Sequence, residues 1–308
     1  MLARHALLVV MTTLILAAAP RSLPAANTIR LRALGDGHVA APVEIAGSPL
    51  RMLVDTGATR SLVRATVAER LHLTPRARFA LHTPTGVVEA VCAGPIGARL
   101  GSVTVSIECL GWSWALDDTA FGGALDGVLA ADALAALPVW IDPGRRRLVL
   151  GEEALAVTGE EVPLALVEGR PVVTLSTRGV GGVPRRLRLV LDSGASELIL
   201  FGSAAAATQA TGATRLATLT GRRRVAVAAT PGLESLRRAP RRALLLPSVT
   251  DRGEDGLLPL SAVGPVAFDW RRGVATLGAR ATGFGRSGRR EGLEVIDPAA
   301  TAGTGGRR

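Results

Sequence analysis

The sequence predicts an all-β protein built from two similar lobes. A four-residue motif, Asp-Thr-Gly-Ala at 55–58, returns as Asp-Ser-Gly-Ala at 192–195, which is 137 residues later. Two further segments follow each copy in the same order. The matching pairs are Leu125–Leu134 with Glu254–Val263, at an offset of 129 residues, and Val139–Gly151 with Ala267–Gly278. Similar segments in a constant order indicate a repeated structural unit.

Each motif ends a strand pattern that begins with a hairpin. In the first half, Val39–Ile45 alternates in polarity and a Gly-Ser-Pro turn leads into the apolar run before Asp55. In the second half, Val172–Thr177 and a glycine-rich turn lead into the run before Asp192. Alternation bounded by glycine turns is typical of β-hairpins. Short helices are expected after each motif, over Ala65–Leu73 and Ala204–Ala210.

The N-terminus has the pattern of a secretory signal peptide. Arg4 precedes an apolar stretch from Ala6 to Ala19, and small residues follow near position 26. We expect a periplasmic or secreted protein, with an uncleaved N-terminal anchor as the alternative. No second apolar segment suggests a membrane span. The expected divisions are 1–26 signal peptide, 27–151 N-terminal lobe, 152–159 linker, 160–279 C-terminal lobe and 280–308 disordered tail.

Composition argues against several other kinds of function. The net charge is +10 and is carried by arginine alone, without interleaved aromatic residues, so nucleic-acid binding is not expected. The four histidines, His5, His38, His72 and His82, lack metal-ligand spacing, and neither a metal nor a cofactor is expected. No Gly-x-Ser-x-Gly elbow occurs near a strand end, which disfavours a serine hydrolase.

The repeated aspartate suggests a chemical mechanism that needs no metal. Two carboxyl groups within about 3 Å of one another cannot both ionise near neutral pH, so they share a proton. Such a pair can activate water against a peptide carbonyl. If the repeat brings Asp55 and Asp192 together, these two residues form such a proton-sharing pair.

These residues resemble the aspartic protease superfamily, and more closely bacterial retropepsin-like proteins, with two tandem units in one chain. The resemblance implies two β-barrel-like lobes related by a pseudo-twofold axis, with an active cleft between them. It implies that Asp55 and Asp192 are catalytic. The residues that would support this pair are Thr56, Gly57, Ala58, Ser193, Gly194 and Ala195. A substrate-binding flap is implied at Thr85-Gly86 and Thr220-Gly221, although a turn without a catalytic role is the alternative for both.

Two positions depart from the family pattern. A Leu-Leu-Gly-like strand normally passes its glycine beneath the catalytic turn, and the aligned residues here are Ala130 and Pro259. Proline removes a backbone donor and fixes φ, so some distortion of the second lobe is expected. The chain also contains no tyrosine, which excludes a flap tyrosine.

Two pairs of residues leave alternatives open. Cys92 and Cys109 are either a disulfide, as in many exported proteins, or two buried free thiols. Trp112 and Trp114 would share one face of a strand. We expect them to pack between the lobes; exposure in a cleft or at a membrane is the alternative.

The sequence therefore predicts an aspartic endopeptidase that acts on a peptide or protein substrate as a two-lobed monomer. The alternative is a non-catalytic peptide-binding module that retains the fold.

Overall fold

The computed structural model describes residues 27–35, 37–84, 86–116, 125–178, 184–218, 221–230, 232–233, 240, 242–247 and 253–282. The expected signal peptide and nearly all of the expected tail lie outside these residues. Within the described part of the chain, no helix has the length and apolar character needed to cross a bilayer.

The first half of the chain is composed almost entirely of strands. Its elements are β1 (Asn27–Arg30), β2 (Arg32–Gly35), β3 (His38–Ile45), β4 (Ser48–Asp55), β5 (Leu62–Val63), α1 (Ala65–Arg70), β6 (Ala77–Thr83), β7 (Gly86–Ala93), β8 (Ile96–Leu100), β9 (Val103–Ile107), β10 (Leu110–Trp112), β11 (Gly127–Ala130), α2 (Ala131–Leu134), β12 (Val139–Asp142) and β13 (Arg147–Leu150).

The second half repeats this composition. Its elements are η2 (Glu152–Leu155), β14 (Val157–Val167), β15 (Arg170–Arg178), β16 (Pro184–Asp192), β17 (Leu198–Phe201), α3 (Gly202–Ala206), β18 (Gly212–Thr218), β19 (Gly221–Ala229), β20 (Gly232–Leu233), β21 (Arg242–Leu246), β22 (Gly256–Pro259), α4 (Leu260–Val263), β23 (Val266–Asp269) and β24 (Val274–Ala281). The prediction of an all-β fold is confirmed.

Both halves pair their strands in the same way. Strand β4 runs parallel to β11, with Asp55 opposite Ala130, and β16 runs parallel to β22, with Asp192 opposite Pro259. The next strand of each half also has a parallel partner, β5 with β10 and β17 with β21. Each Asp thus ends a strand that is paired on both sides, because β3 and β15 complete the hairpins. This pairing fixes the direction in which each turn leaves the sheet.

Six strands join the two halves. Their order is β1-β13-β12-β23-β24-β14, and the contact across the middle is β12 against β23, with Trp140 opposite Ala267. The expected linker 152–159 contains η2 and the first residues of β14, which pairs with β24. Arg280 and Ala281, at the start of the expected tail, belong to β24. We call these six strands the shared strands.

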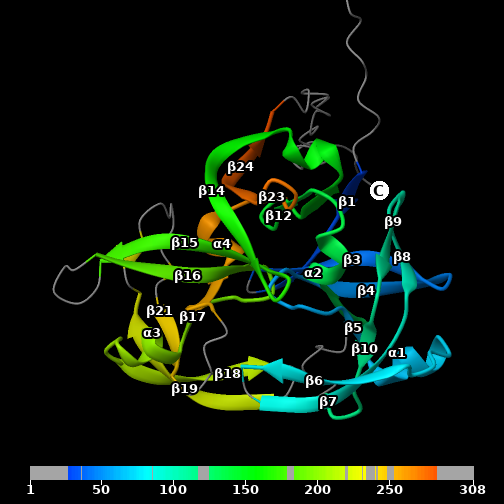
Figure 1. Cartoon of the computed structure of the whole chain (residues 1–308), viewed down its shortest axis with the longest axis horizontal. Helices are drawn as coiled ribbons and strands as arrows, with labels where there is room; N and C mark the ends of the chain where they lie inside the picture. Colours follow the sequence, from blue (N-terminus) through cyan, green and yellow to red (C-terminus); the bar gives the residue numbers. More distant parts are fainter. Residues whose placement is uncertain are drawn as a thin grey trace, which may run out of the picture.

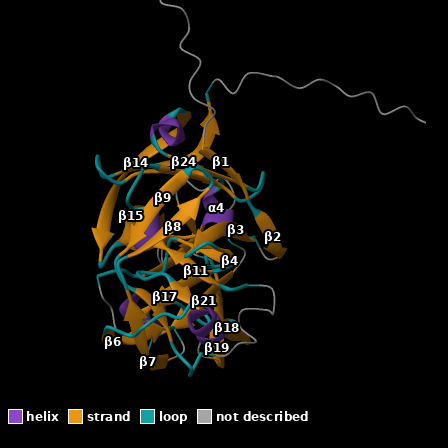
Figure 2. Cartoon of the chain, turned by 90° about the vertical axis from the view of Figure 1, so that its right-hand side faces the viewer, coloured by secondary structure: helices purple, strands orange, loops and turns teal. Residues whose placement is uncertain are grey.

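The core extends across both halves as well. One large buried cluster includes Met52 and Val54 from β4 together with Leu189 and Leu191 from β16. Burying apolar area from both Asp strands in one cluster stabilises their relative placement. In Figures 1 and 2 the shared strands lie at one end of the molecule, and the hairpins β6–β7 and β18–β19 lie at the other.

Two local expectations need correction. The helix expected over Ala204–Ala210 begins earlier and ends at Ala206, while the one expected over Ala65–Leu73 ends at Arg70. The two tryptophans do not share a strand face, because β10 ends at Trp112. Trp112 is buried, whereas Trp114 is 65% exposed and its indole N–H donates to Glu69. The prediction that both rings pack between the lobes is therefore wrong for Trp114.

Candidate active site

The two aspartate turns fold in the same way at the ends of their strands. The Oδ1 atom of Asp55 accepts hydrogen bonds from the backbone N–H groups of Gly57 and Ala58, both at 2.9 Å. In the second turn, Oδ1 of Asp192 accepts from the N–H of Gly194 at 2.7 Å. A carboxylate held by its own turn in this way has a fixed orientation before any ligand arrives.

Buried hydroxyl groups lock the two turns to each other. Thr56 Oγ1 donates to the carbonyl of Leu191 at 2.7 Å and accepts from the N–H of Ser193 at 3.1 Å. Ser193 Oγ donates to the carbonyl of Val54 at 2.7 Å and accepts from the N–H of Thr56 at 3.0 Å. These four bonds obey a twofold relation. We refer to them as the hydroxyl lock.

Each glycine leaves room for the carboxyl group of the opposite turn. A Cβ atom on Gly57 would lie 2.3 Å from Cγ of Asp192, and one on Gly194 would lie 2.4 Å from Cγ of Asp55. No side chain fits at such distances, so only glycine permits the approach. Each carboxyl group therefore lies directly against the glycine of the opposite turn. The structure thus brings together two residues that are 137 positions apart.

Burial makes both carboxyl groups harder to ionise. Removal from water raises the pKa of Asp55, although hydrogen bonds from Ala58, Asp192 and Gly57 oppose the rise. Burial also raises the pKa of Asp192 well above its usual range, and the negative charge of Asp55 raises it further. The pair can hold one proton between two carboxylates at a pH where isolated aspartates have lost theirs. Such a pair can act as an acid and a base together.

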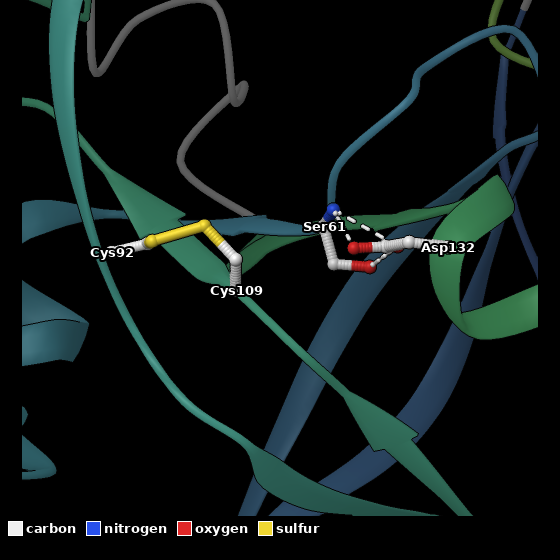
Figure 3. Close-up of a disulfide and its surroundings, with 4 residues drawn as sticks. All are labelled: Ser61, Cys92, Cys109 and Asp132. Atoms are coloured by element: carbon white, nitrogen blue, oxygen red, sulfur yellow. Dashed lines mark hydrogen bonds between the residues drawn. A yellow bond between two sulfur atoms is a disulfide. The ribbon is translucent and has the colours of Figure 1, made fainter. Parts of the chain in front are cut away.

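A polar network formed by Ser61 and Asp132 holds the segment that follows the first turn (Figure 3). The carboxylate of Asp132, at the start of α2, accepts hydrogen bonds from the N–H and the hydroxyl group of Ser61. Ser61 Oγ in turn accepts from the N–H of Ala130, the residue opposite Asp55. Burial raises the pKa of Asp132. The segment after the first turn is therefore tied to the strand beneath it.

The second half replaces this network with apolar packing. The strand register equates Ser61 with Leu198, Ala130 with Pro259 and Asp132 with Ser261. Pro259 lacks the N–H that Ala130 donates, but the equivalent position also lacks the hydroxyl that would accept it. The register of β22 continues through Pro259, whose φ of −65° suits the ring. The distortion that we expected at Pro259 is absent because the acceptor and the donor are lost together.

Sequence reasoning missed a second pair of equivalent aspartates. The carboxylate of Asp126 accepts from the N–H of Arg51, and that of Asp255 accepts from the N–H of Arg188, both at 2.8 Å. Each aspartate N–H also donates to the carbonyl of the same arginine. Both aspartates lie in the second matched segment of the repeat. The Asp-Gly pair that precedes an apolar strand in each half is the sequence signal that could have identified them.

Both expected flaps are β-hairpins with equivalent geometry. Strands β6 and β7 end with Thr83 opposite Gly86, and β18 and β19 end with Thr218 opposite Gly221. Thr85 and Thr220, expected at the tips, lie outside the described residues. Apolar side chains of the first hairpin, Leu81 and Val88, pack in one cluster with Ala58. The inner face of this hairpin is therefore directed toward the first turn.

Cys92 and Cys109 are joined by a disulfide bond, with their Cα atoms 5.3 Å apart (Figure 3). Cys92 lies in β7, and Cys109 immediately precedes β10, the parallel partner of β5. The bond thus ties the first hairpin to the strand that pairs with β5, which follows the first turn.

His38 is a residue near the site that sequence reasoning did not select. It begins β3, and its Nε2 atom lies 3.0 Å from the carbonyl oxygen of Gly194. No local pattern marks it, because the contact joins residues 156 positions apart. His72, by contrast, is exposed and follows α1. Among the described residues, no cluster of three or more His, Cys, Asp or Glu could hold a metal ion.

Comparison with protein-family models relates the first half of the chain to a known family. Residues 41–111 match the model described as "gag-polyprotein putative aspartyl protease". The matched stretch includes the Asp55 turn, Ser61, both strands of the first hairpin and both cysteines. A search of curated proteins found no match. The expected resemblance to retropepsin-like aspartyl proteases is thus confirmed for the first half, and the family supports a protease-type function.

Proposed function

Since residues 41–111 are similar to retropepsin-like aspartyl proteases, we propose that this protein is an aspartic endopeptidase whose catalytic pair is Asp55 and Asp192. The observation that carries the proposal is the mutual approach of the two turns. Each glycine Cβ position lies less than 2.5 Å from the opposite carboxyl carbon. Two carboxyl groups from separate halves of the chain thus form one site.

The proposed reaction uses the single proton that the pair retains. The ionised carboxylate takes a proton from a water molecule, whose oxygen attacks the peptide carbonyl, while the protonated carboxyl donates to the carbonyl oxygen. The tetrahedral intermediate collapses when a carboxyl group returns a proton to the leaving amine, and the C–N bond breaks. Because the hydroxyl lock holds both turns, little reorganisation is needed as charge moves.

The substrate would lie extended between the turns and the hairpins. Gly86 and Gly221 begin β7 and β19, the second strands of the two hairpins, and an extended peptide can bond to backbone groups at these turns. The small side chains of Ala58 and Ala195 leave space beside the carboxyl groups. One chain supplies both aspartates, so a monomer would suffice for activity.

The decisive experiment is peptide-library cleavage across acidic to neutral pH. Wild type is compared with Asp55→Asn and Asp192→Asn, and with Asp269→Asn as a matched control in the shared strands. Asp269 accepts a turn hydrogen bond from Arg272, which asparagine can also accept. We expect each dyad variant to lose at least about 10³-fold in kcat and the control to retain activity. Cleavage that survives either dyad substitution would exclude the mechanism; peptide binding without cleavage would favour a non-catalytic module.

We also infer that the protein is exported to the periplasm or secreted. The support is the apolar N-terminal pattern and the disulfide bond, since disulfides persist in oxidising compartments. N-terminal sequencing of protein from cell fractions tests this. A mature N-terminus near residue 27 is expected, and an intact Met1 in the membrane fraction would indicate an anchor instead.

A further inference from the structure

The two halves also differ at the position of His38. His38 is half-buried, and its Nε2 atom contacts the carbonyl oxygen of Gly194, in the turn of the opposite half. A carbonyl oxygen only accepts hydrogen bonds, so Nε2 must carry the proton in this contact. The ring thus links β3 of the first half to the Asp192 turn, in addition to the hydroxyl lock.

The equivalent position in the second half holds a neutralised charge. Leu53 and Val190 each lie two residues before the aspartate of their strand, and their partners on the neighbouring strands are Ala40 and Val172. Counting back two residues from each partner gives His38 in the first half and Arg170 in the second. His38 therefore corresponds to Arg170. The guanidinium of Arg170 forms a buried ion pair with Glu254 at 2.8 Å and also contacts Glu168. The charge of Arg170 is therefore neutralised by these glutamates, whereas the ring of His38 contacts the Asp192 turn.

The charged neighbours of His38 favour an interaction with the pair. The titratable side chains nearest to it are Asp55 and Asp192 from the two turns and Arg32 from β2, which is exposed. The other strands beside β3 carry Arg30 on β1, which is exposed, and Arg51 and Arg99, which lie further along β3, opposite Pro42 and Glu44. The α4 helix contributes only Ser261, which packs near Gly37. Burial raises the pKa of Asp55, but the charge of His38 acts in the opposite direction and favours the ionised form of this carboxyl. Histidine is the side chain that changes charge between pH 5 and 8.

Given the proposed function, we propose that His38 is a positioning residue that makes the two carboxyl groups unequal, so that Asp55 is the base and Asp192 retains the proton. The cationic ring stabilises negative charge on Asp55, and its N–H fixes the Gly194 carbonyl of the opposite turn. The ring lies close enough for this, because the Gly194 carbonyl that it contacts belongs to the residue on which an added Cβ atom would lie 2.4 Å from Cγ of Asp55. The direction of proton transfer is then set before substrate binds.

Two substitutions separate the charge of His38 from its hydrogen bond. His38→Gln retains an N–H near the position of Nε2 but cannot ionise, whereas His38→Ala loses both. His72→Asn, at an exposed position, is the control. For His38→Gln we expect the acid limb of the kcat profile to move to higher pH, with kcat at pH 4 reduced by about three- to tenfold and KM unchanged. His38→Ala should lower kcat at every pH because the hydrogen bond to Gly194 is lost. His38→Gln keeps this bond, so its kcat should equal that of the wild type at pH values above the acid limb.

Two spectroscopic measurements test the inference independently of cleavage. Carboxyl ¹³C titration of wild type and His38→Gln should show that Asp55 ionises at higher pH in the variant. Long-range ¹H–¹⁵N spectra of the wild type should show the proton on Nε2 of His38. An unchanged pH profile and unchanged Asp55 titration in His38→Gln would overturn the proposal even if the enzyme cleaves peptides. Wild-type protein that never cleaves, with Asp55 still coupled to His38, would instead refute the proposed function alone.

Discussion

Thr56→Val tests the hydroxyl lock directly, because valine keeps the shape of threonine and removes only its hydroxyl. Thr56 is fully buried and Ser193 is 4% exposed, so water cannot replace the lost bonds. The substitution leaves the Leu191 carbonyl and the Ser193 N–H without their partner. Each orphaned buried group costs about 1–3 kcal/mol, and for two such groups we therefore expect a loss of about 2–6 kcal/mol in the free energy of unfolding.

The assay is guanidinium denaturation followed by tryptophan fluorescence, with peptide cleavage measured in parallel. Thr104→Val, on the exposed side of β9, is the matched control and should change stability by less than about 0.5 kcal/mol. Cleavage should fall in Thr56→Val because the two turns lose their register. If Thr56→Val and Thr104→Val are equally stable, the hydroxyl lock does not hold the two halves together.

Three further predictions concern the surroundings of the pair. Gly57→Ala places a Cβ atom 2.3 Å from the Asp192 carboxyl carbon and should reduce kcat by about 10²-fold or more in steady-state assays, whereas Gly212→Ala, with open space around it, should not. Because burial raises the pKa of Asp192, the folded protein keeps protons that the unfolded chain releases as pH rises. Stability should therefore fall with rising pH through that window. Asp192→Asn should accordingly raise the melting temperature at pH 7 but not at pH 3, as scanning calorimetry would show; an equal gain at both values would contradict it. Ser61→Ala orphans the buried Ala130 N–H and should cost about 1–3 kcal/mol in denaturant melts, against almost nothing for the exposed Ser106→Ala.

The repeat made the fold and the location of the pair predictable from the sequence. Asp55 and Asp192 each end an apolar strand, and the matched segments around them implied equivalent strand pairing. The helix bounds and the orientation of Trp114 were less accessible, because short elements depend on packing rather than on local pattern. The consequence of Pro259 was misjudged for a related reason, since Leu198, which replaces the acceptor Ser61 of the first half, lies 61 residues away.

Two equivalent carboxyl turns, each on a strand of one repeated unit, follow from the amino-acid sequence alone. Local chemistry was enough for this, because the glycine after each aspartate and the alternation before it specify a tight turn at a strand end. Only the tertiary structure decided that the two turns face each other, that the hydroxyl groups of Thr56 and Ser193 cross between them, and that His38 contacts just one of them. These contacts join residues more than 130 positions apart, and their geometry follows from the shared core and shared strands rather than from any local sequence.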